Sequence, residues 1–192
     1  MYQNRNKEFD VIALYREDYK ARFYLREISK LAKLPLKTCQ NILAYLEKQR
    51  ILKSKLEGKN KYFNLNLDNI QTKSHLLKAE IYKTDLFLEK YSEFKTFLKS
   101  ININSTIIIF GSFARLMAGK DSDLDLFIIS NKEEKLPFHL LPYKIHKNSL
   151  SEESFKKAIA EKETLIKEIG ANHLILNNHS SYVNIMWEYY GK

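Results

Sequence analysis

The chain has 192 residues, of which 44% are hydrophobic, and its formal net charge is +9. This length allows one large domain or two small ones, and no apolar run approaches the roughly 20 residues of a membrane-spanning helix. The polar first residues and the single cysteine, Cys39, argue against a signal peptide and an internal disulfide, so we expect a cytoplasmic protein without a membrane partner.

The positive charge is concentrated at the amino-terminal end. Residues 1–70 hold 15 of the 32 Lys and Arg residues and 8 of the 23 Asp and Glu residues, so they carry +7. This excess favours a polyanion as partner, although many basic proteins bind none.

Apolar residues at helical spacing predict three helices, over 8–19, from about residue 25 to Leu34-Pro35, and over 36–49. The expected buried positions of the second and third helices are Leu25, Ile28, Leu31, Ala32, Leu36, Cys39, Ile42, Leu43 and Leu46. Two strands, 51–56 and 61–65, should follow around a turn that contains Gly58.

Three helices and a basic hairpin resemble the small prokaryotic winged-helix transcription regulators over residues 8–66. The resemblance rests on the apolar Ile51-Leu52 after the third helix and on the hairpin run Gly-Lys-Asn-Lys-Tyr. It implies that the third helix enters the major groove of duplex DNA and that hairpin lysines contact phosphates. The expected DNA-binding residues are Lys37, Thr38, Gln40, Asn41, Lys59 and Lys61. A winged helix that docks a protein is the alternative.

Residues 67–100 contain neither Pro nor Gly and have a helical pattern of apolar residues, which predicts a helical connector that fixes one domain against the other. We expect a winged helix-turn-helix domain at 1–68, a connector at 69–100 and a second domain at 101–192.

A strand, a tight turn and a second strand follow the connector. The buried strand 106–110 ends at Gly111, where a residue without Cβ allows a sharp turn. Ser112 should cap a short helix whose free N–H groups suit a phosphate. In the second strand, 123–129, the period of two puts Asp123 and Asp125 on one face.

This stretch resembles the minimal nucleotidyltransferases of the DNA polymerase β-like superfamily. Their signature is Gly-Ser, ten residues and Asp-x-Asp, and Gly111-Ser112 and Asp123-Leu124-Asp125 match it without a gap. One departure is that Leu116 follows the Ala114-Arg115 pair, where members often carry a glycine.

The resemblance implies transfer of a nucleoside monophosphate, AMP from ATP, to a hydroxyl of a protein or nucleic acid. Asp123 and Asp125 would be the catalytic residues and hold Mg²⁺, and Gly111 and Ser112 would cradle the triphosphate. Arg115 and Lys120 are further candidates for phosphate contacts. Related minimal transferases are antitoxins that modify a separate toxin, so a toxin-like protein acceptor is a candidate partner.

Active members usually add a third carboxylate from the neighbouring strand, which here should lie within 138–147 and contains no Asp or Glu. His146 is the first candidate for a substitute base and His139 the second, and a histidine base would give activity that rises with pH through roughly 6.5. The alternative acids, before and after that strand, are Glu133, Glu134, Glu152 and Glu153.

Beyond the motif, Pro137 and Pro142 predict that the strand within 136–148 is an edge strand or contains a bulge. A helix over 151–169, a short strand at 174–176 and a final helix at 182–190 should complete the chain. The expected fold is therefore α+β, with a winged helix-turn-helix followed by a small nucleotidyltransferase fold whose mixed sheet is flanked by helices.

Two further hypotheses remain open beside the transferase. The chain could be a DNA-binding regulator whose degenerate transferase domain senses a nucleotide or forms a homodimer, or a protein-interaction module in which neither activity survives.

Overall fold

The computed structural model describes residues 6–119 and 121–191. The chain forms two compact units, Met1–Ala79 with Tyr190–Lys192 and Glu80–Tyr189. The division falls inside one long helix, α4 (Ile70–Lys90). The domain boundaries drawn from the sequence stay predictions.

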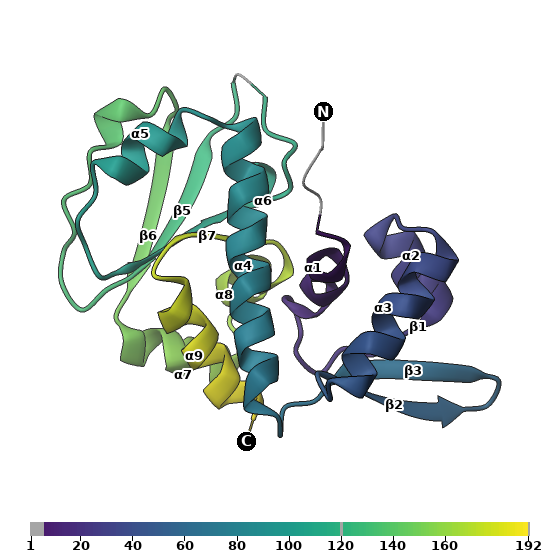
Figure 1. Ribbon diagram of the computed structural model, residues 1–192. Coiled ribbons are helices and arrows are strands. Elements are labelled where there is room, and N and C mark those ends of the chain that lie inside the picture. The colour runs from purple at the N-terminus through teal and green to yellow at the C-terminus, as the bar shows by residue number, and fades with distance from the viewer. Residues whose placement is uncertain (1–5, 120, 192) are drawn as a thin grey trace. The chain divides into compact units, whose positions relative to one another are not determined.

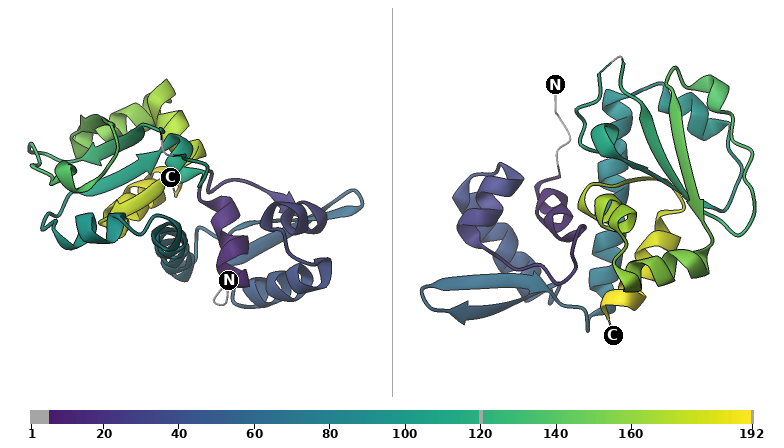
Figure 2. Two further views of the ribbon diagram at one scale, coloured as in Figure 1. Left: turned by 90° about the horizontal axis from the view of Figure 1, so that it is seen from above. Right: turned by 180° about the vertical axis from the view of Figure 1, so that it is seen from behind.

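The first unit contains short helices packed on a small antiparallel sheet (Figure 1). Its elements before α4 are α1 (Lys7–Ile12), η1 (Ala13–Tyr15), β1 (Phe23–Tyr24), α2 (Leu25–Ala32), α3 (Leu36–Lys48), β2 (Leu52–Glu57) and β3 (Asn60–Leu65). The sheet order is β1-β3-β2. All three views show the β2–β3 hairpin as a long two-stranded arm (Figures 1 and 2). The predicted second and third helices and the hairpin are confirmed.

Three expectations for this unit are wrong. The first helix ends at Tyr15 and not at residue 19, and the Asp18 carboxylate accepts a hydrogen bond from the Lys20 N–H at 2.8 Å, a local bond that competes with helix. Leu31 and Leu36 are not buried, since their exposed fractions are 51% and 47%. Ile28 and Ala32 form the buried side of α2, and Leu31 lies outside that side. Leu36 is the first residue of α3.

The second unit contains a four-stranded mixed sheet with helices on both faces. The order is β6-β5-β4-β7, in which β5 and β6 are parallel and the other two pairs are antiparallel. Its elements after α4 are α5 (Phe94–Lys99), β4 (Thr106–Phe110), α6 (Gly111–Ala114), β5 (Leu124–Ile129), η2 (Phe138–Leu140), β6 (Ile145–Leu150), α7 (Glu152–Glu161), α8 (Thr164–Ala171), β7 (Leu174–Asn177) and α9 (His179–Tyr190). The structure is thus α+β with a mixed sheet, as expected.

Alternate residues of the central strands pack against different helices. Ile107 and Ile109 lie in one core with Phe87 of α4 and Phe94 of α5. On the other face the Phe127 ring contacts Phe155 of α7, with centroids 5.6 Å apart. Both faces of the central strands are therefore buried.

The structure interrupts two predicted helices. The helix expected over 67–100 breaks after Lys90, where the rings of Phe87, Tyr91 and Phe94 pack together and turn the chain. The helix expected over 151–169 breaks at Lys162, which takes a left-handed backbone with a φ of 56°. Tertiary packing and a non-glycine left-handed residue leave no clear signal in a sequence.

The strand expected within 136–148 is shorter and begins later. The Pro137 region forms the 3₁₀ turn η2, and only β6 is extended. As predicted from the prolines, β6 is an edge strand. Among the described residues, no helix has the length and apolar run that crossing a membrane requires.

Candidate nucleotide and metal site

Gly111 directly follows the buried strand β4 and lies against Asp125 of β5. Its φ of 69° is left-handed, and a Cβ built on it would stand 2.5 Å from Asp125 Oδ2. The register explains the approach, because Phe110 pairs with Asp125 across the antiparallel β4–β5 ladder. The left-handed backbone therefore favours glycine, and a side chain at this position would displace the Asp125 carboxylate.

The turn after Gly111 differs in detail from the expectation. The α-helix begins at Gly111 itself, its N-cap is Phe110, and no side chain caps it. The hydroxyl of Ser112 therefore does not cap this helix, which has only four residues. Ser112 is half-buried beside Gly111.

Asp123 and Asp125 stand at the start of β5 with their side chains partly exposed, by 41% and 33%. The intervening Leu124 and the following Leu126 are fully buried. The two carboxylates therefore lie on one face of the strand, opposite the face that carries the buried leucines, as the period of two predicts.

Of the two candidate bases, the structure brings His146 to the aspartates. Its Nε2 lies 3.5 Å from Asp123 Oδ2 and its Nδ1 lies 3.6 Å from Asp125 Oδ1. The parallel register places His146 directly beside Asp125. His139 instead has an exposed side chain in η2, and within the described ranges no ion pair joins it to either aspartate.

The four alternative glutamates are at the other end of the sheet. Glu134 is buried and accepts hydrogen bonds from Ser105 and Ser130, beyond the ends of β4 and β5. Glu133 lines a cavity there, and the Glu152 N–H donates to Asn131, with Glu153 next in the same helix turn. Seven residue steps separate Asp123 from Ser130 at that end, a distance of roughly 23 Å at about 3.3 Å per residue. Glu133 and Glu134 are therefore separated from the aspartates by the length of β5, and Glu152 and Glu153 follow the far end of β6 because β5 and β6 run parallel.

Lys144 is a neighbour that the sequence reading missed. Its Nζ lies 3.6 Å from Asp123 Oδ2. The signal was available, since Lys144 precedes His146 by two residues and thus shares its face of an extended segment. Arg115 is the exposed C-cap of α6, and in the described part of the chain no ion pair joins it to the aspartates. Lys120 lies outside the described residues.

The donor set fits a hard divalent cation that brings its own ligands. Within residues 6–119 and 121–191, no group of three or more His, Cys, Asp and Glu side chains could hold a metal ion. Asp123 and Asp125 supply carboxylate oxygens, and Mg²⁺ is usually held by one or two carboxylates with phosphate oxygens and water completing its shell. The missing Cβ of Gly111 leaves Asp125 unobstructed for that role.

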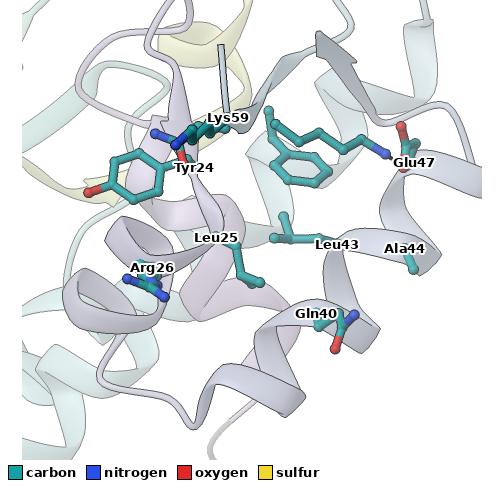
Figure 3. Close-up of a pocket in the computed structure, with 11 residues that line it drawn as sticks. Tyr24, Leu25, Arg26, Gln40, Leu43, Ala44, Glu47 and Lys59 are labelled. Atoms are coloured by element: carbon teal, nitrogen blue, oxygen red, sulfur yellow. Dashed lines mark hydrogen bonds and ion pairs between the residues drawn. The ribbon is translucent and has the colours of Figure 1, made fainter. Parts of the chain in front are cut away.

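The predicted DNA-binding residues lie in the first unit, and only some of them share a surface. Gln40, Lys59 and Lys61 line a hollow of about 790 Å³ between α2, α3 and the hairpin (Figure 3). Lys37 and Asn41 are exposed on α3 and Thr38 is half-buried, but none of the three lines the hollow. Tyr24 and Arg26, which the sequence reading did not select, line it.

Lys61 is partly neutralised. Its Nζ donates to Glu47 Oε2 at 2.8 Å, and Ser54 donates to the other oxygen of the same carboxylate. These hydrogen bonds, from Lys61 first and Ser54 second, hold the pKa of Glu47 below its ordinary value. Among the described residues no ion pair joins Lys59 or Arg26 to an acidic group.

Comparison with known proteins gives one finding. No curated protein and no solved structure matches the chain. Residues 91–179, however, match the family model of the nucleotidyltransferase domain. This span contains Gly111, Asp123, Asp125 and His146, so the part of the chain that carries the candidate site is similar to nucleotidyltransferases, and the match supports nucleotidyl transfer as its chemistry.

Proposed function

We propose that the second unit transfers AMP from ATP, in the presence of Mg²⁺, to a hydroxyl of a protein or nucleic acid. The observation that carries this proposal is the contact between Gly111 and Asp125. A backbone turn that has no side chain and a pair of carboxylates meet at one point, and a nucleoside triphosphate with its metal needs both.

The proposed reaction divides its work between phosphate-binding, metal-binding and proton-accepting residues. Gly111 and Ser112 would cradle the triphosphate, with Arg115 and Lys120 as further phosphate contacts. Asp123 and Asp125 would hold Mg²⁺, which when bound neutralises phosphate charge. The acceptor oxygen forms a bond to the α-phosphorus, and the bond from that phosphorus to the departing pyrophosphate breaks. His146 takes the hydroxyl proton, a role typically worth about 10²- to 10⁴-fold in rate.

Calorimetry with Mg²⁺-ATP tests the site. Asp125→Asn should keep the fold and weaken nucleotide binding at least about tenfold, because a carboxylate that holds the metal becomes a neutral amide. Asp121→Asn is the matched control, since this exposed aspartate lies just before the site. Equal affinity in both variants and the wild type would remove the site assignment.

The acceptor can be identified by where the label goes. Full-length protein incubated with ATP labelled in the α-phosphate should transfer the label to a protein hydroxyl, such as that of a toxin-like partner, or to nucleic acid. Binding without transfer would favour the regulator whose transferase unit only senses a nucleotide or forms a homodimer.

A second function, binding of duplex DNA by a winged helix in the first unit, is favoured by the hollow shown in Figure 3. Helix α3 and the hairpin form its walls, and Lys59 and Arg26 stand on its lining. The +7 charge of residues 1–70 is complementary to a phosphate backbone. The proposed contacts are Lys37, Thr38, Gln40, Asn41, Lys59 and Lys61.

The salt dependence of DNA binding by the full chain tests this function. Lys59→Gln should lower the slope of log affinity against log salt by about one unit. Lys61→Gln should lower it by less, because Glu47 already neutralises that lysine. Affinity that does not change between low and high salt would refute the electrostatic basis.

A further inference from the structure

The contacts of His146 argue against its acting as a third metal ligand. Its two ring nitrogens lie against different aspartates, at 3.5 Å from Asp123 and 3.6 Å from Asp125. The imidazole therefore stands between the carboxylates rather than directing one nitrogen at a point that both share. Strand register fixes this place, because Asp125 and His146 are paired in the parallel β5–β6 ladder.

The strands around the aspartates offer few carboxylate ligands for a pair of divalent cations. Lys144 lies 3.6 Å from Asp123, so it offsets part of the negative charge of that carboxylate. Strand β6, with the sequence IHKNSL, contributes no carboxylate. Two metal ions in one site stand about 3.5–4 Å apart and bring four positive charges. The triphosphate can offset much of that charge, but Asp123, already beside Lys144, and Asp125 would have to supply the protein ligands of both cations, because β6 offers no further carboxylate.

We propose that this site holds one divalent cation, the one that arrives with the triphosphate, and that position 146 is where the carboxylate for a second cation is missing. The inference rests on the proposed nucleotide site and adds its metal stoichiometry.

The test counts Mn²⁺ and nucleotide on the same protein. Full-length chain is dialysed against Mn²⁺ and α,β-methylene-ATP, which cannot release pyrophosphate, and bound Mn²⁺ is measured from the electron paramagnetic resonance of the free ion. Wild type should hold about one Mn²⁺ per bound nucleotide, His146→Asn should hold the same number, and His146→Asp should hold about two.

The outcomes separate the two proposals. Two Mn²⁺ per nucleotide in the wild type would overturn the inference and leave the proposed function intact. No binding of nucleotide would refute the proposed function itself. The wild-type ratio decides the metal count even if His146→Asp fails to fold. A folded His146→Asp variant that still holds one ion would refute the assignment of position 146.

Discussion

Gly111 and Gly58 both have left-handed backbones, with φ of 69° and 59°, but differ in their surroundings. A Cβ on Gly58 would meet nothing within 4 Å, whereas one on Gly111 would meet Asp125 Oδ2 at 2.5 Å. That oxygen is the tip of a side chain that can rotate, so it can move away. The movement would take the carboxylate from the position that the site needs.

We therefore expect Gly111→Ala and Gly58→Ala to lower the free energy of unfolding by similar amounts, about 1 kcal/mol each from backbone strain. Only Gly111→Ala should weaken Mg²⁺-ATP binding, by at least about tenfold. Thermal unfolding and calorimetry measure the two effects. A loss of nucleotide affinity in Gly58→Ala, or none in Gly111→Ala, would contradict the role of the Gly111–Asp125 approach.

Leu116 has the left-handed backbone conformation that is usual for a glycine. It ends α6 with a φ of 57°, the Leu116 N–H donates to Phe113 O at 2.9 Å, and the Met117 N–H donates to Ser112 O at 3.0 Å. These two bonds form a Schellman motif, in which this position is usually glycine. The departure from the family pattern noted at this position therefore changes the side chain and keeps the backbone.

Comparing Gly with Ala at position 116 isolates the backbone strain, because both variants lose the leucine side chain. Leu116→Gly should be more stable to unfolding than Leu116→Ala by about 1 kcal/mol. The order should reverse at the exposed Lys157 inside α7, where glycine is the poorer helix residue by about 1 kcal/mol. Urea unfolding of the four variants gives the comparison. The same order at both positions would argue against strain at Leu116.

At the scale of elements, the Glu47–Lys61 pair joins α3 to strand β3 of the hairpin. Because the folded-state pKa of Glu47 lies below its ordinary value of 4.5, the pair contributes stability above that value. The contribution is lost as the pH falls through the lowered pKa and the carboxylate takes up a proton.

Wild type should therefore be more stable than Glu47→Gln at pH 7, by less than about 1 kcal/mol because both side chains are partly exposed. The difference should shrink as the pH falls below 4.5 and vanish once the pH lies below the lowered pKa of Glu47. Urea unfolding at several pH values measures it, and the Glu47→Gln/Lys61→Gln double variant shows whether the pair is its source. A stability difference that does not change with pH would show that the Glu47–Lys61 ion pair is not its source.

The sequence predicted elements whose signals are local. Strands β4 and β5 and the Gly111 turn are contiguous, so periodicity and one glycine were enough to place Asp123 and Asp125 together. Strand β1 has only two residues and exists because it pairs with β3, a partner almost forty positions away. The left-handed Lys162 and Leu116 were missed because neither is a glycine.

At the scale of the whole molecule, only the part of the candidate site that lies within one contiguous segment could be predicted from the sequence. His146 was a candidate because it is a histidine on the expected neighbouring strand. Its place between the aspartates depends on the parallel register of β5 and β6, which pattern alone does not determine. The same register places Glu152 and Glu153 at the opposite end of the sheet, which sequence reasoning could not establish.

The position of β4 in the sheet has a consequence for biosynthesis. All five residues of β4 are buried, and it lies between β5 and β7, although β7 begins only at Leu174. While the chain is being synthesised, one edge of this apolar strand therefore has no partner until β7 has been made. Unpaired apolar edges promote association between chains. The sheet is thus completed only after β7 leaves the ribosome, and until then the unpaired edge of β4 is exposed to association with other chains.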